Sequence, residues 1–175
     1  MYIHTDNARR YTVGILVDNE PGVLTRVSGL FSRRGFNIES LTVGTTTDPQ
    51  ISRITIVVVG DEAKIEQLVQ QLYKLICVQK VQVMQPRNSV ERQLLLVKVS
   101  ADVTEREGLM RLVDIFKAKV LDVTRNSMTL QITGENDKIA SMLSLLEDYG
   151  ILELVRTGVV ALERGDGVMS SDIFD

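Results

Sequence analysis

The chain has 175 residues, of which 44% are hydrophobic, so it holds enough apolar material for one large or two small folded domains. Its formal net charge of -3 provides no bulk attraction to nucleic acid or to an anionic membrane, and we expect neither as a partner. The single cysteine, Cys77, excludes an internal disulfide and a CxxC site. With no signal peptide and no long apolar run, the sequence predicts a cytoplasmic protein, or a plastid protein if the chain is a processed one.

The first half of the chain alternates between strand and helix periodicities. Residues 1–10 are polar and are expected to form a flexible N-terminus. The order that follows is strand, helix, strand, strand, helix, strand, predicted at residues 11–17, 23–34, 36–43, 51–59, 65–75 and 78–84. Residues 11–84 thus form a ferredoxin-like module, an antiparallel sheet of four strands with both helices on one face. The third strand is apolar on both faces, so we expect another chain or domain to cover its second face, which carries Val57 and Val59.

The second half repeats this order with little sequence likeness to the first. Residues 85–90 form a short polar linker, and residues 91–163 are predicted to form a second ferredoxin-like module. Its strands and helices are predicted at 94–99, 105–118, 120–124, 128–133, 137–149 and 151–155, with 159–162 as a continuation of the last strand. Residues 164–175 are acidic, contain glycine and are expected to be a flexible tail. The predicted fold class is therefore α+β, with two βαββαβ modules.

One loop, at the junction of the first strand and the first helix, has the features of a ligand site. Pro21 suits a helix entry because its φ is fixed and it lacks an amide proton, and Gly22 lets another group approach the backbone. The amides of the first helical turn favour a carboxylate or a phosphate, and the side-chain carbonyl of Asn19 can accept from an ammonium. One interpretation is therefore a site for a small zwitterion. The other is purely structural, with Asn19 as a helix cap and Gly22 as a turn residue.

Residues that carry out catalysis are scarce. The only histidine is His4, in the expected flexible N-terminus, and the sequence has no HExxH, GxSxG, P-loop or GxGxxG motif. No cluster of histidines and cysteines indicates a metal site. A sheet that binds RNA would need exposed aromatic side chains, and aromatic residues make up only 5% of the chain. We therefore predict a binding or regulatory module, with a small enzyme on a ferredoxin-like scaffold as the remaining alternative.

Two motifs of the first module go beyond periodicity. Asn-x-Pro-Gly-Val-Leu at 19–24 resembles the loop of ACT domains, the amino-acid-sensing modules of many regulated enzymes. Arg-Gly-Phe-Asn-Ile-Glu-Ser-Leu-Thr-Val at 34–43 is more specific, and it resembles the regulatory small subunit of acetolactate synthase, also called acetohydroxyacid synthase. Further similarities at 48–56, 90–99 and 158–162 extend the resemblance over residues 10–165.

The resemblance implies a non-catalytic regulatory subunit. Such a subunit binds the large catalytic subunit of acetolactate synthase, a transferase in branched-chain amino-acid biosynthesis, raises its activity and confers feedback inhibition by valine. Thiamine diphosphate, magnesium and FAD are then expected on the catalytic subunit alone, and this chain is expected to hold no cofactor. A free-standing ACT-type amino-acid sensor with another client is the alternative.

The resemblance also implies where the effector binds. ACT modules of this family pair side by side as homodimers, so that two four-stranded sheets form one sheet of eight strands. The effector, valine or a related branched-chain amino acid, lies at the interface. One chain provides residues of the helix-entry loop and the other provides the start of the second strand. The matching positions in this sequence are Asn19, Gly22, Val23, Leu24, Asn37 and Ile38.

Overall fold

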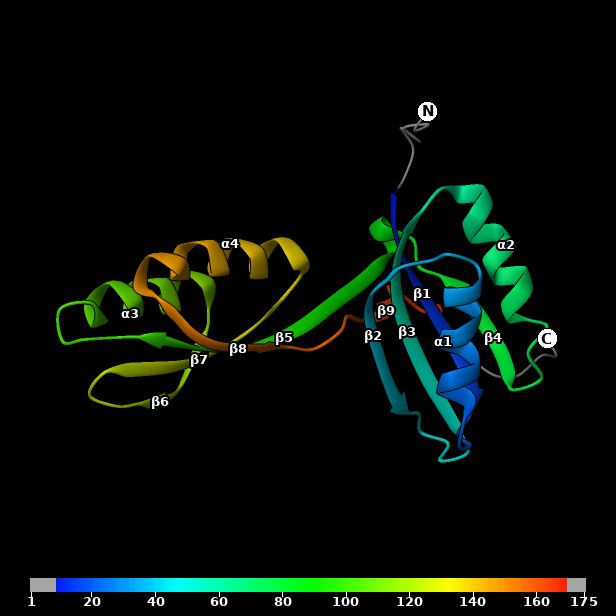
Figure 1. The fold of residues 1–175 in the computed structure, drawn as a ribbon, viewed down its shortest axis with the longest axis horizontal. Coiled ribbons are helices and arrows are strands. Elements are labelled where there is room, and N and C mark those ends of the chain that lie inside the picture. Colours follow the sequence, from blue (N-terminus) through cyan, green and yellow to red (C-terminus); the bar gives the residue numbers. More distant parts are fainter. Residues whose placement is uncertain (1–8, 170–175) are drawn as a thin grey trace. The chain divides into compact units, whose positions relative to one another are not determined.

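The computed structural model describes residues 9–169 and divides into two compact units. One unit holds the chain up to Val90 together with the segment that starts at Val159, and the other spans Glu91–Gly158. Each unit is built on an antiparallel sheet with two helices, so the fold is α+β, as predicted (Figure 1). Most of the predicted flexible N-terminus lies outside the described residues, but Arg9 and Arg10 already belong to the first strand.

The first unit has the predicted βαββαβ order. Its elements are β1 (Arg9–Asp18), α1 (Val23–Arg33), β2 (Ile38–Thr45), β3 (Ile51–Gly60), α2 (Glu62–Leu72) and β4 (Val78–Val83). The strands pair antiparallel in the order β2-β3-β1-β4, so that β2 and β4 form the two edges of the sheet. Both helices lie on one face of this sheet (Figure 1).

The core of the first unit lies between that face and the helices. Successive side chains of a strand point to opposite faces, and Val13, Ile15 and Val17 of β1 are all buried in this core. Val27 and Phe31 enter it from α1, where residues four apart lie on the same side of the helix. The alternation that predicts β1 and the helical spacing that predicts α1 therefore arise from one shared core.

The second unit follows the same plan. Its elements are β5 (Ser89–Ser100), α3 (Arg106–Phe116), β6 (Lys119–Val123), β7 (Ser127–Gly134), α4 (Asn136–Leu146) and β8 (Ile151–Arg156), and its strands pair in the order β6-β7-β5-β8. Leu95 and Val97 of β5 are buried in its core with Leu109 of α3 and Ile139 of α4. Two 3-10 helices, η1 (Pro86–Asn88) and η2 (Glu147–Tyr149), occupy the predicted linker and the end of the last predicted helix. The linker is shorter than predicted, because β5 starts at Ser89.

The end of the chain differs from the predicted domain boundaries. Residues 159–162 do not continue β8: a break separates β8 from β9 (Val160–Glu163), and β9 belongs to the first unit, where it pairs with β5. The second unit therefore ends at Gly158 rather than at residue 163. The alternation of buried and exposed residues in β9 suits any sheet, so periodicity did not indicate its partner. The predicted flexible tail begins after β9, and its residues 170–175 lie outside the described residues.

Residues 159–169, here called the return segment, cover the second face of the first sheet. Val159 N donates to Ser40 Oγ at 2.8 Å, and Arg53 Nη2 donates to Ala161 O at 2.8 Å. Val57, on the face opposite the helices, is fully buried. The predicted cover of the second face of β3 is thus found at Val57 and comes from the same chain, whereas Val59 on that face is 43% exposed.

Candidate functional site

The loop between β1 and α1 has the predicted helix-entry geometry. Gly22 precedes α1 with φ 83° and ψ -7°, a left-handed conformation that glycine adopts without strain, and no side chain in the described residues caps this helix. Gly22 O accepts from Arg26 N at 3.1 Å, whereas the amides of Leu24 and Thr25 have no acceptor within residues 9–169. These two amides lie at the positive end of α1, and they are therefore available to a carboxylate.

Asn19 does not cap the helix; it attaches the loop to the turn between β2 and β3. Its Nδ2 donates to Pro49 O at 2.8 Å, and its Oδ1 accepts from Ser52 Oγ at 3.0 Å. Its backbone N also donates to Gln50 O at 2.7 Å. Each polar group of the side chain has a partner within the chain, and these hydrogen bonds position the loop.

A second attachment holds the start of the loop from the other side. Asp18 Oδ1 accepts from Gln79 Nε2 at 2.6 Å, and Asp18 N donates to Cys77 O at 2.9 Å. The loop is therefore fixed to the turn before β4 as well as to the turn before β3. We did not predict Asp18, Gln79, Pro49 or Ser52 as site residues, because contacts between residues so distant in the chain leave no signal in a single sequence.

The two apolar loop residues differ in exposure. Val23 is 3% exposed and belongs to the core of the first unit, whereas Leu24 is 41% exposed. Val23 therefore anchors the start of α1 in the core. Of the two side chains, only that of Leu24 is exposed enough for a ligand to contact.

Asn37 and Ile38 lie at the other end of the sheet from the loop. On β3, Ile51 pairs with Asp18 and Val58 pairs with Ile38. From Ile51 to Val58 a strand advances by about 23 Å, at about 3.3 Å per residue. One chain therefore does not bring the six predicted residues together: Asn19, Gly22, Val23 and Leu24 form one group, and Asn37 and Ile38 form another.

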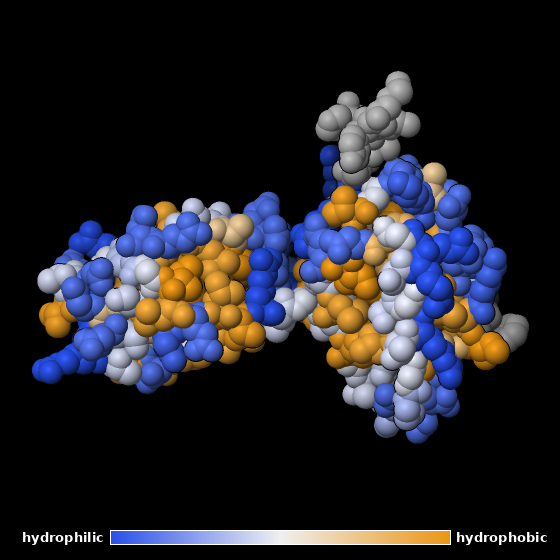
Figure 2. Space-filling view, viewed as in Figure 1, coloured by the Kyte–Doolittle hydropathy of each residue, from blue (hydrophilic) through white to orange (hydrophobic). Residues whose placement is uncertain are grey.

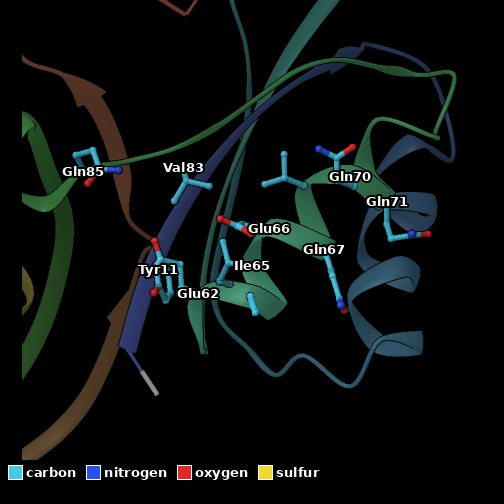
Figure 3. Close-up of a pocket in the computed structure, with 11 residues that line it drawn as sticks. Tyr11, Glu62, Ile65, Glu66, Gln67, Gln70, Gln71, Val83 and Gln85 are labelled. Atoms are coloured by element: carbon cyan, nitrogen blue, oxygen red, sulfur yellow. The ribbon is translucent and has the colours of Figure 1, made fainter. Parts of the chain in front are cut away.

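A groove of about 700 Å³ lies elsewhere on the first unit, between α2 and β4 (Figure 3). Tyr11, Ile65 and Val83 line its apolar part, and Glu62 and Glu66 of α2 lie on its polar side. None of the six predicted site residues lines this groove of the described chain, so it is distinct from the predicted effector site.

Two further properties of the described chain bear on function. In residues 9–169, no helix is long and apolar enough to cross a membrane. The same residues bring together no group of three or more His, Cys, Asp or Glu side chains that could hold a metal ion.

The first unit, with its Pro-Gly helix entry, has the architecture of an ACT domain. The family model of the AHAS small subunit-like ACT domain matches residues 13–80, and the model of the small subunit of acetolactate synthase matches residues 92–165. The two family models thus cover both units of the chain.

Individual relatives agree with the family models. The probable acetolactate synthase small subunit of Archaeoglobus fulgidus is 50% identical over 157 residues, which are 90% of this chain and 98% of that protein. The acetolactate synthase small subunit of Mycolicibacterium smegmatis is 48% identical over 155 residues, 89% of this chain and 91% of its own. The crystal structure of the small subunit from Thermotoga maritima matches with a TM-score of 0.85 and 42% identity, over 91% of this chain and 99% of that chain. The chain belongs to the family of acetolactate synthase small subunits.

Proposed function

We propose that this chain is the regulatory subunit that binds the catalytic subunit of acetolactate synthase, raises its activity and makes it sensitive to inhibition by valine. The observation that carries the proposal is the helix entry at Gly22, which leaves the amides of Leu24 and Thr25 without an acceptor in residues 9–169. This geometry suits an amino-acid carboxylate, and it occurs in a chain of the small-subunit family.

The proposed effector site needs two chains. Since β2 is an edge strand, its outer backbone groups can pair with β2 of a second copy. In antiparallel pairing, the start of one β2 lies beside the end of the other. The end of β2 lies next to the loop of its own chain, because Thr45 pairs with Ser52 and Ser52 Oγ donates to Asn19. A homodimer through β2 therefore places Asn37 and Ile38 of one chain beside the loop of the other.

The composition of β2 supports such pairing. Unpaired edges are usually protected by charged residues, yet Glu39 is the only charged residue of β2. Val43 of β2 is 44% exposed. Figure 2 shows apolar side chains gathered on the β2 side of the first unit, and pairing of two copies would cover part of this surface.

A branched-chain amino acid has the groups that this arrangement would recognise. Its carboxylate would accept from the amides of Leu24 and Thr25, and its ammonium would donate to the side-chain carbonyl of Asn37. Leu24 of one chain and Ile38 of the other would contact its branched side chain. Valine is small enough to be enclosed by two such side chains, and it is the effector we propose.

Binding between two chains explains how an amino acid can regulate an enzyme. The ligand stabilises the paired state because it binds only that state. For valine to inhibit, it must bind the inhibited arrangement of the complex more tightly than the active one. Coupling of this kind is typically about 1–3 kcal/mol, or about 5- to 150-fold in affinity. In this proposal thiamine diphosphate, magnesium and FAD stay on the catalytic subunit, and the complex operates in the cytoplasm, or in a plastid if the chain is a processed one.

Reconstitution with the catalytic subunit tests the proposal. Acetolactate formation is measured for the purified catalytic subunit alone, with this chain, and with this chain and valine. We expect activation by the chain and inhibition on adding valine, with serine as the control amino acid. Valine binding to the chain without any effect on the catalytic subunit would instead support the free-standing sensor with another client.

A further inference from the structure

At the one irregularity in the pairing of β2 with β3, a residue of the proposed effector site is followed by two residues with different hydrogen-bond partners. The register shifts between Ile38 and Ser40, so that Glu39 is the extra residue of a β-bulge. Ile38 belongs to the proposed effector site. Glu39 Oε2 accepts from Arg10 Nε at 2.8 Å, and Ser40 Oγ accepts from Val159 N at 2.8 Å. A ligand that contacts Ile38 therefore contacts a bulge whose other two residues are bonded to separate parts of the chain.

Val159 occupies a particular place in the chain, because the second unit ends at Gly158. Its side chain is buried, at 2% exposure, and the acceptor for its amide is Ser40 Oγ. This is the only hydrogen bond from β2 to the return segment among the described residues. Val159, the first residue after the second unit, is thus held by the side chain of Ser40, which lies two positions after Ile38.

The other hydrogen bonds of the return segment join it to β3, to β4 and to residues 88–89. Arg53 of β3 donates to Ala161 O, and Gln82 of β4 donates from Nε2 to Glu163 Oε2 at 2.9 Å. Burial lowers the pKa of Arg53, whose Nε has no hydrogen-bond partner in the described chain. These contacts lie away from the bulge, so the segment stays attached to the sheet while its first residue can respond to β2.

We infer that Ser40 couples the effector site to the return segment, and through Val159 to the chain that enters from the second unit; this inference rests on the proposed function. A ligand that fixes Asn37 and Ile38 restricts the bulge and holds Ser40 Oγ in position to accept from Val159. Without the ligand the bulge is free to shift, and this hydrogen bond opens more often. Linkage requires the converse, that loss of the hydrogen bond weakens ligand binding.

Hydrogen exchange of the full-length protein tests the coupling, measured with and without valine for the amides of residues 159–164. In the wild type, we expect valine to slow exchange at Val159 by about fivefold or more, the lower end of typical allosteric coupling. Ser40→Ala is expected to bind valine about fivefold more weakly, and valine is expected no longer to slow hydrogen exchange at Val159. Both effects follow from the same coupling free energy between the effector site and Val159. Ser40→Thr keeps the hydroxyl and is expected to keep the response.

The matched control is Thr42→Val. Thr42 lies on the same face of β2 as Ser40, and its Oγ1 is buried without a partner in the described chain, so this variant removes a hydroxyl that holds nothing. We expect it to respond to valine as the wild type does.

The outcomes separate this inference from the proposed function. Calorimetric valine binding with unchanged exchange at Val159 in the wild type overturns the inference and leaves the proposed function intact. A full response in Ser40→Ala overturns it as well. If valine does not bind at all, the proposed function fails and the inference fails with it. The wild-type measurement decides alone if Ser40→Ala does not fold.

Discussion

Replacement of Gly22 by aspartate tests the effector site sharply, because the variant is expected to fold. A Cβ built at Gly22 meets no described atom within 4 Å, so the cost is confined to the backbone. A left-handed φ costs an ordinary residue about 1–2 kcal/mol, and aspartate tolerates it better than most. A carboxylate at a helix start recovers about 0.3–1 kcal/mol. The net loss of stability is therefore about 1 kcal/mol, a decrease of a few degrees in Tm.

The expected effect of this substitution on valine binding is much larger. The new carboxylate competes for the amides of Leu24 and Thr25, each of which contributes about 1.5–3 kcal/mol when it binds a charged group. It also repels the carboxylate of valine, by about 1–4 kcal/mol at a separation of about 4 Å. Together these terms exceed about 2.8 kcal/mol, and we expect at least about a hundredfold loss of affinity.

Calorimetric titration with valine, together with thermal unfolding, measures both effects. The matched control is Gly35→Asp, because Gly35 also has a positive φ, 73°, and a Cβ there meets no described atom within 4 Å. This residue follows the other end of α1, where the helix dipole disfavours a carboxylate, so the control should lose more stability than Gly22→Asp and keep its valine affinity. The reasoning is refuted if Gly22→Asp binds valine as tightly as the wild type, or if Gly35→Asp weakens binding equally.

Other substitutions separate the roles of individual residues. Asn19→Ala removes the hydrogen bonds to Pro49 and Ser52 and should cost about 1–3 kcal/mol in urea unfolding; an unchanged midpoint would contradict its positioning role. Asn37→Ala should change this stability by less than about 0.5 kcal/mol, since Asn37 is exposed. It should lower valine affinity by about 13- to 160-fold, because a hydrogen bond to the charged ammonium contributes about 1.5–3 kcal/mol; equal affinity would remove Asn37 from the site. Phe31→Ala, at a fully buried position in edge-to-face contact with Phe36, should cost about 3–5 kcal/mol by calorimetry. Asp61 is the N-cap of α2, and the hydrogen bond from Lys64 N holds the pKa of its carboxyl below the ordinary value. The stabilising contribution of Asp61 is therefore present at neutral pH and is lost as pH falls through the lowered pKa. Asp61→Ala should accordingly show a weaker loss of stability in acid than the wild type.

Most elements of both units could be predicted because they bury residues at the spacing of a helix or a strand, although β6 and β8 contain no buried residue. The helix predicted at 23–34 is found at Val23–Arg33, and the strand predicted at 51–59 is found at Ile51–Gly60. Residues 159–163 are predicted in the wrong module for the same reason. Val159 and Ala161 are buried and alternate with exposed residues, as in a strand. Such alternation shows which face of a strand is buried, but not which sheet the strand joins.

The candidate site was predictable in part. Pro21 and Gly22 indicate a helix entry, and the positive φ of Gly22 agrees with that prediction. The role of Asn19 could not be decided from the sequence, because a cap and an anchor to a distant turn have the same local pattern. The structure decides for the anchor, through Pro49 and Ser52.

Isothermal titration calorimetry of the purified full-length protein with valine tests the central claim most directly. We expect saturable binding at about two equivalent sites per dimer, as two-fold symmetry dictates, and no heat of binding from serine. No binding of valine, either to this chain alone or in the presence of the catalytic subunit, would contradict its role as an amino-acid sensor.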